Sequence, residues 1–183
     1  MIRIFIAAAF AAVALTGAAK AQAFPAKPLE LIIPYPPGGA ADILGRLTAR
    51  EMESHLGQPV IVLNKGGAGT IIGAQAAAAA KPDGYTLFYA TSAIVLAPSL
   101  YANPGFDPYN DFTPISLTAT IPLALVVWSN VPAKTLPEFI AWLKTQPGQV
   151  NYASSGTGAL LHLAGELFLK ETGTKAVHVP YRG

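Results

Sequence analysis

The chain has 183 residues, of which 52% are hydrophobic, 12% are charged and none is cysteine, and its formal net charge is +2. This composition excludes a disordered tail, a disulfide scaffold, and any thiolate nucleophile or cysteine-based metal site. The 12 basic and 10 acidic residues form no cluster that would attract the phosphates of a nucleic acid. The length predicts one or two small domains.

An uncharged apolar run near the start of the chain is typical of a secretory signal. The run extends from Ile4 to Leu15, follows the positive charge of Arg3, and is shorter than the ~20 residues that a helical membrane span needs. The small residues Ala21 and Ala23 follow and fit a cleavage site. We therefore predict a signal peptide over residues 1–23 and a periplasmic mature chain.

Strand and helix patterns alternate in the first part of the mature chain. Segments rich in β-branched and aromatic residues at 29–33, 60–63 and 85–89 are separated by helical patterns at 40–56 and about 70–80. Such alternation predicts α/β layers around a largely parallel sheet.

The pattern is less regular in the middle and then becomes regular again. Residues 91–101 are predicted to form a loop with a short helix, and Thr135 and Glu138 form a capping box that opens a helix running to residue 146. Further strands are predicted at 112–119, 123–129, 150–153 and 176–179, with a helix at 159–172. We expect two α/β lobes, at 24–121 and 122–183, with the second incomplete because the chain is truncated after its last strand.

Two loops of small residues each join a strand to a helix. Gly38 and Gly39 precede the first helix, and Gly156 and Gly158 precede the helix at 159–172. Free N–H groups at the start of a helix bind anions, aided by the helix dipole. Asp42 lies in the first turn, where it can accept hydrogen bonds from the same N–H groups. Each loop also fits an ordinary strand-to-helix connection, but the pair suits a ligand with one or two carboxylates held between two lobes.

The other motifs favour no catalysis and no cofactor. The pattern Gly67-x-Gly69-x-x-x-Gly73 imitates a dinucleotide fingerprint, but its last spacing is wrong and no acidic residue ends the next strand. There is no G-x-S-x-G nucleophile motif and no H-E-x-x-H metal motif. We therefore predict no catalytic residue, no metal site and no cofactor.

The histidines and tryptophans have simple interpretations. His162 and Glu166 share one helix face, as any pair at that spacing does, so His162 is interpreted as a helix-surface histidine near a cleft. His55 and His178 are isolated along the sequence. Trp128 and Trp142 are predicted to be packing residues.

An ordered set of short motifs resembles one known family. These include Pro34-Tyr35-Pro36-Pro37-Gly38-Gly39-x-x-Asp42, Pro82-Asp83-Gly84-Tyr85-Thr86-Leu87, Asn151-Tyr152-Ala153-Ser154, His162-Leu163-Ala164-Gly165-Glu166 and His178-Val179-Pro180-Tyr181-Arg182-Gly183. In this order they are similar to the Bug family (TctC-like) of periplasmic substrate-binding receptors, which serve tripartite tricarboxylate transporters. The resemblance extends over essentially the whole chain.

The resemblance implies a fold, a ligand class and a site. The implied fold is the α/β type II periplasmic binding protein fold, with two lobes closing on a ligand. The implied ligands are small carboxylates: di- or tricarboxylates, acidic amino acids or aromatic acids. The site residues carried over from the family are Gly38, Gly39, Ala40, Asp42, Thr91, Ser92, Ser154, Gly156, Gly158 and His162.

The chain also departs from the family pattern. Ala159 stands where the family often has a hydroxyl residue, Ala97 stands where it often has asparagine, and the family continues well beyond Gly183. We therefore expect a less polar site and leave the choice of carboxylate open.

The sequence as a whole predicts a monomeric solute-binding receptor, not an enzyme. Its expected partners are a small carboxylate and membrane transporter subunits, with no nucleic acid. The alternatives are an extracytoplasmic ligand-sensing protein, an exported α/β enzyme and a non-functional fragment.

Overall fold

A computed structural model describes residues 23–181 of the chain. The predicted signal peptide, apart from its last residue, lies outside the described residues. Within those residues, no helix combines the length and the apolar character needed to cross a membrane.

The first part of the molecule is built on a parallel sheet of three strands. These are β1 (Leu29–Ile33), β2 (Val60–Asn64) and β3 (Thr86–Phe88), in the order β2-β1-β3. Central strand β1 is almost entirely buried, and Glu30 pairs with Ile61 on one side and with Thr86 on the other. The predicted strands and their parallel arrangement are confirmed.

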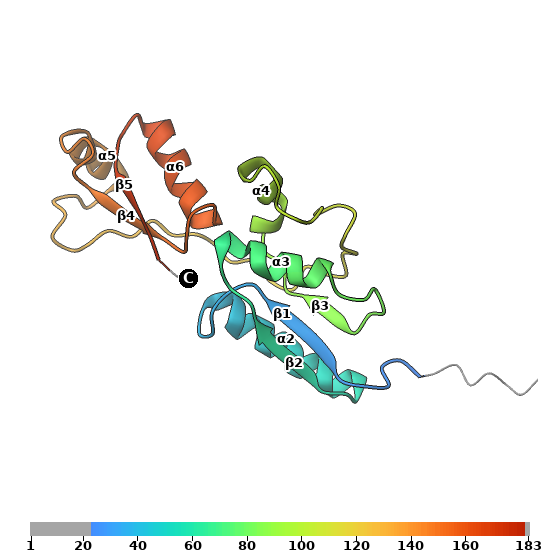
Figure 1. Ribbon diagram of the computed structural model, residues 1–183. Helices are drawn as coiled ribbons and strands as arrows, with labels where there is room; N and C mark the ends of the chain where they lie inside the picture. The colour runs from blue at the N-terminus through green and yellow to red at the C-terminus, as the bar shows by residue number, and fades with distance from the viewer. Residues whose placement is uncertain (1–22, 182–183) are drawn as a thin grey trace, which may run out of the picture.

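Helices cover both faces of this sheet (Figure 1). Helix α2 (Ala40–Leu56) packs on one face, where Leu29, Leu31 and Ile33 form a core with Ala49 and Val60. The 3-10 turn η1 (Ala68–Thr70), α3 (Ile71–Ala78) and α4 (Ala93–Leu100) belong to the other face, where a second core contains Ile71, Ala74, Ala97 and Phe106. Gly57 ends α2 in a left-handed conformation, as the pattern predicts.

The second part of the molecule is a smaller α/β unit. Strands β4 (Asn151–Ser154) and β5 (Val177–Pro180) form a parallel pair, accompanied by α5 (Leu136–Lys144) and α6 (Leu160–Thr172). At the start of α5, the Thr135 side chain accepts a hydrogen bond from the Glu138 N–H. The Glu138 carboxylate accepts the N–H of Lys134, and backbone hydrogen bonds from both Lys134 and Thr135 lower the pKa of Glu138.

The predicted strands at 112–119 and 123–129 are not formed. Both segments belong to the long connection between the two parts of the molecule, and neither is a strand in the structure. Ile115, Leu117 and Val126 are each at least 80% exposed. A β-strand requires another strand to pair with its N–H and C=O groups, and within the described residues these segments pair with neither sheet. The apolar pattern alone was therefore misleading.

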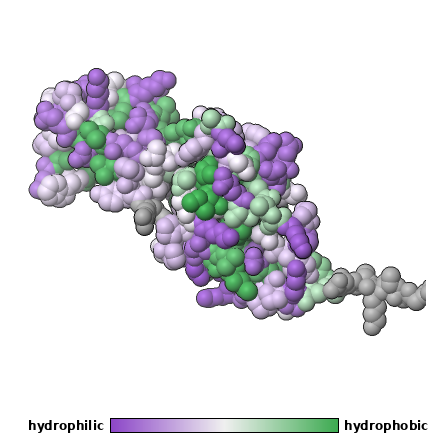
Figure 2. Space-filling model, in the orientation of Figure 1, coloured by the Kyte–Doolittle hydropathy of each residue, from purple (hydrophilic) through white to green (hydrophobic). Residues whose placement is uncertain are grey.

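Hydrophobic residues reach the surface on both parts of the molecule (Figure 2). Trp128 is 75% exposed, so its predicted packing role is wrong. Trp142 does pack, with its ring 5.9 Å from that of Phe139. The predicted lobe boundary between residues 121 and 122 falls in the unpaired connection and stays a prediction.

Candidate ligand-binding site

The carboxyl ends of the first sheet bring polar side chains together. Tyr35 follows β1, Asn64 ends β2 and Thr91 follows β3. The Tyr35 hydroxyl lies 3.1 Å from Thr91 Oγ1, and the Asn64 amide donates to the Tyr35 carbonyl at 2.9 Å. Parallel strands end at one edge of their sheet, and that edge is where α/β proteins commonly bind ligands.

Asp42 organises the proline–glycine loop (residues 34–39) from within the protein. Its side chain is only 5% exposed and accepts hydrogen bonds from the Gly38 N–H at 2.9 Å, from Arg46 at 3.0 Å and from Asn64 at 2.8 Å. The Arg46 hydrogen bond is the main reason that the pKa of Asp42 falls to about 2, and the Gly38 and Asn64 bonds act in the same direction. Asp42 is therefore a buried anion that holds the loop.

This arrangement divides the predicted donors of the first loop into two groups. The Gly38 N–H is already bonded to Asp42. Gly39 is the N-cap of α2 and has no side chain to accept the first-turn N–H groups, which include that of Ala40. Gly39 and Ala40 are thus better placed than Gly38 to donate to an anion. Ser92 is the N-cap of α4 and is exposed.

The serine–glycine loop (residues 155–158) follows β4 and is held by two side chains. Ser154 Oγ accepts the Gly156 N–H at 3.2 Å and lies 2.6 Å from His178 Nε2. The Gly158 N–H donates to His162 Nδ1 at 3.2 Å. Both glycine N–H groups that were predicted to meet a ligand are therefore bonded within the protein.

The imidazole of His162 stacks on that of His178, with ring centroids 4.0 Å apart. Burial lowers the pKa of His178, as does the neighbouring His162. On the other side, His162 Nε2 lies 3.9 Å from Glu166 Oε1, which also accepts the Tyr152 hydroxyl. Burial raises the pKa of Tyr152, with a further contribution from Glu166.

The interpretation of His178 as isolated is therefore wrong. Strands β4 and β5 are parallel neighbours that pair Tyr152 with His178 and Ser154 with Pro180. The sequence pattern could have predicted this contact, because it indicates two strands joined by one helix, and such strands are commonly parallel neighbours. Among the described residues, no group of three or more His, Cys, Asp or Glu side chains could hold a metal ion.

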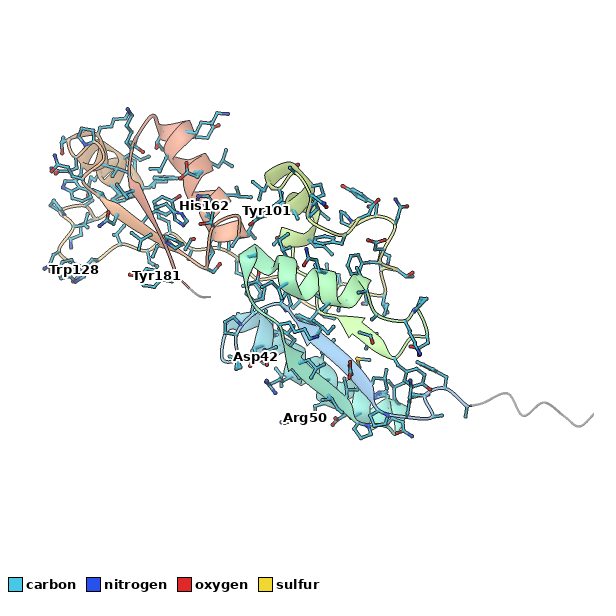
Figure 3. The ribbon with its side chains drawn as sticks, viewed as in Figure 1. Asp42, Arg50, Tyr101, Trp128, His162 and Tyr181 are labelled. Carbon is cyan, nitrogen blue, oxygen red and sulfur yellow. The ribbon has the colours of Figure 1, made fainter. Side chains whose placement is uncertain are left out.

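The two parts of the molecule touch where the loop between β2 and α3 meets the serine–glycine loop. The Tyr101 hydroxyl, on the residue after α4, lies 3.4 Å from the Ala68 carbonyl oxygen and 3.5 Å from that of Thr157. A Cβ atom added to Gly69 would lie 2.8 Å from the Thr157 carbonyl oxygen, and one added to Gly158 would lie 2.9 Å from the Tyr101 hydroxyl. Figure 3 shows Tyr101 and His162 near this junction, with Trp128 at the far side of the smaller unit.

The glycine pattern at 67–73 thus supplies a close contact between the two parts. Sequence reasoning missed Tyr101 because a single tyrosine after a helix carries no pattern. The structure groups the candidates at two carboxyl edges: Gly38, Gly39, Ala40, Asp42, Thr91 and Ser92 at the first, and Ser154, Gly156, Gly158 and His162 at the second. Their contact with a ligand stays a prediction.

Comparisons with known proteins agree with this architecture. A family model described as "Tripartite tricarboxylate transporter family receptor" matches residues 44–183. Protein BugT of Bordetella pertussis is 39% identical over 186 residues, covering 100% of this chain and 56% of BugT. Among solved structures, an R. palustris protein with adipate is 34% identical with a TM-score of 0.83. MatC of Rhodopseudomonas palustris with bound malate is 31% identical with a TM-score of 0.76.

Each of these two structural matches covers 87% of this chain, and 54% and 55% respectively of the solved chain. The chain likewise spans about half the length of the curated relatives it matches. The resemblance in the motifs and the α/β fold of periplasmic binding proteins are confirmed. Because the family match extends over most of the chain, this protein belongs to the tripartite tricarboxylate transporter receptor family.

Proposed function

We propose that this chain captures a small organic carboxylate in the periplasm and delivers it to the membrane subunits of a tripartite tricarboxylate transporter. The observation that carries the proposal is that two strand-to-helix loops from two separate α/β units meet at Tyr101: the β2–α3 loop at Ala68 and the serine–glycine loop at Thr157. The β2–α3 loop in turn lies against the proline–glycine loop, where a Cβ atom added to Gly66 would lie 3.0 Å from Pro36 Cδ. Both loops lead into helix N-termini, which favour anions. The signal peptide over 1–23 belongs to this proposal, as does the division into lobes at 24–121 and 122–183.

The proposed ligand is a dicarboxylate, because two helix ends can each receive one carboxylate group. Relatives solved with adipate and with malate support this class. Gly39, Ala40, Thr91 and Ser92 would meet one carboxylate, and the serine–glycine loop with His162 would meet the other. Asp42 and Ser154 act as positioning residues, since their polar atoms are bonded to the loops themselves. The ligand would stabilise a closed arrangement of the two units, and no bond in it would be made or broken.

An enzyme is the second candidate, because Ser154 Oγ and His178 Nε2 are close enough for a nucleophile and its base. The surroundings of this pair disfavour catalysis. Ser154 is buried, and the nearest N–H that could stabilise an oxyanion, that of Gly156, donates to Ser154 Oγ itself. The ligand recovered after a binding experiment should therefore be chemically unchanged.

Replacing Gly39 by proline tests the first loop. Gly39 has φ −79°, which proline accepts, so the substitution removes the N–H without requiring a new φ at this residue. We expect dicarboxylate affinity to fall by about tenfold, since a hydrogen bond to a charged group contributes about 1.5–3 kcal/mol. Isothermal titration calorimetry with adipate and malate measures the dissociation constant.

Gly39→Ala is the matched control, because alanine keeps the N–H at the same φ. It should bind like the unsubstituted chain. If folded Gly39→Pro binds with the same affinity as the unsubstituted chain, the Gly39 N–H does not contact the ligand. If the unsubstituted chain fails to bind any di- or tricarboxylate, the proposed function is overturned.

A further inference from the structure

His162 acts as an internal hydrogen-bond acceptor at the start of its own helix. Its Nδ1 atom accepts the Gly158 N–H at 3.2 Å. The N-cap of α6 is Ala159, which has no side-chain oxygen to accept the free N–H groups. The imidazole therefore occupies the N–H group of the residue that directly precedes the N-cap of α6.

This hydrogen bond defines the protonation state of His162. An Nδ1 atom that accepts a hydrogen bond carries no proton, so His162 is neutral here with its proton on Nε2. That Nε2–H group lies on the side of Glu166, with 3.9 Å between Nε2 and Oε1. If Nδ1 gains a proton it becomes a donor, and its bond with the Gly158 N–H is lost.

The groups around His162 come from three elements. Glu166 lies one turn further along α6, Tyr152 extends from β4 and donates its hydroxyl to Glu166, and His178 stacks from β5. Ser154, also on β4, is bonded to His178. Of these groups, only the Glu166 carboxylate is an anion, and it adjoins His162 directly.

A proton entering this cluster is directed to His162. Two imidazolium cations with centroids 4.0 Å apart would repel each other, so at most one ring of the stacked pair takes up an additional proton. His178 is the poorer acceptor, because burial and its neighbour lower its pKa and its Nε2 is bonded to Ser154. His162 has the Glu166 carboxylate beside it to stabilise the cation.

We propose that His162 is a proton-operated cap on the α6 end of the carboxylate site, so that ligand and one proton bind together. In its neutral form His162 holds the Gly158 N–H. Proton uptake at Nδ1 releases that N–H towards the ligand and places a positive charge beside the helix end. This inference rests on the proposed function and adds a proton to the captured species.

Linkage gives the sign and the limit of the effect. Because a proton is taken up with the ligand, affinity must fall as pH rises. The limit is about a tenfold change in dissociation constant per pH unit for one proton. Histidine changes charge between about pH 5 and 8, so the measurable range is about pH 6 to 8, where dicarboxylate probes are largely ionised.

The experiment is calorimetry with adipate and malate at several pH values in that range, in two buffers with different ionisation enthalpies. The difference between buffers gives the number of protons taken up per ligand. The unsubstituted chain should take up a fraction of one proton and bind several-fold more tightly at the acid end. His162→Gln should take up none and bind with the same affinity at each pH, because its amide gains no charge in this range.

Two further variants separate this role from a general histidine effect. His55→Gln changes an exposed histidine on α2 that bonds only to neighbouring residues of its own helix, and it should keep the full pH dependence. His178→Gln should also keep it, because the proton resides on His162. If His162→Gln does not fold, NMR of the unsubstituted chain serves instead: the Gly158 amide signal should shift together with the His162 ring signals.

The outcomes distinguish the two proposals. Binding with equal affinity at all pH values, without proton uptake, overturns the cap and leaves the proposed function standing. Proton-linked binding that persists in His162→Gln also overturns the cap. So does a Gly158 amide NMR signal that stays constant with pH while the His162 ring signals shift. No carboxylate binding at any pH overturns the proposed function, and the cap with it.

Discussion

At the residue scale, one buried charged group positions a loop instead of facing solvent. This group is Asp42, a carboxylate that was predicted to meet a ligand and is bonded to Gly38, Arg46 and Asn64 instead. A buried carboxylate must be fully hydrogen-bonded to remain ionised, and these three partners provide that. Asp42 thereby links α2, the end of β2 and the proline–glycine loop.

The low pKa of Asp42 makes stability depend on pH. The pKa falls from 3.8 to about 2 on folding, so the stabilisation is fully present above about pH 4 and is lost as pH falls towards 2. We expect Asp42→Asn to lower the free energy of unfolding at pH 7 by about 2 kcal/mol and to weaken its dependence on pH between 4 and 2. Urea denaturation at several pH values measures both effects.

Glu51→Gln is the control, since Glu51 is an exposed carboxylate on the same helix. It should leave the unfolding free energy within about 0.5 kcal/mol of the original. An Asp42→Asn chain as stable as the original at pH 7 would show that the buried network contributes nothing.

At the element scale, glycines set how closely the helices approach the first sheet. Gly73 on α3 faces the chain just beyond β1, where an added Cβ would lie 2.7 Å from Pro34 Cβ and 2.9 Å from the Lys65 carbonyl oxygen. Gly45 on α2 faces β1 itself, where a Cβ would lie 2.5 Å from Ile33 Cδ1. Backbone atoms cannot move aside as the end of a side chain can, so the two sites differ in tolerance.

Gly73→Ala should therefore destabilise the protein although alanine favours helices. The helix propensity gain is about 1 kcal/mol, and overpacking against backbone costs about 1–3 kcal/mol or more. We expect a net loss of about 1–2 kcal/mol, measured by chemical denaturation. Gly45→Ala is the matched comparison and should lose less. The reverse order of the two variants would contradict this account of the packing.

At the scale of the whole molecule, two α/β units are joined by a long exposed connection and touch at Tyr101. The connection contains apolar residues in strand-like patterns, yet they lie in solvent. Within the described residues, the backbone of this connection forms no strand hydrogen bonds with either sheet. Stability should accordingly be uneven along the chain, with the lowest local stability in the connection.

Limited proteolysis tests this distribution. We expect a protease that cuts beside large apolar residues to cleave first within residues 113–129, where Leu117 and Trp128 are exposed, and to spare both sheets. Mass spectrometry of the first fragments locates the cut. Initial cleavage inside α3 or β1 would show that the connection is protected, as pairing with a second copy would make it.

The sequence by itself determined the local elements and the family. Period and turn chemistry act over a few residues, so β1, α2 and α6 could be predicted close to their observed bounds, together with the Gly57 stop and the two loops that lead into helices. The family motifs then supplied the ligand class. None of this required knowledge of which segments meet.

Only the tertiary structure decided which groups share a site and which apolar segments pair. The contact of Ser154 with His178, the stacking of His162 on His178 and the reach of Tyr101 to Thr157 join residues 24, 16 and 56 positions apart. The segments at 112–119 and 123–129 carry a strand pattern but pair with no strand among residues 23–181. Hydrogen bonds and ring contacts form between neighbours in space, and a linear pattern states only what each residue could offer, not which partner lies beside it.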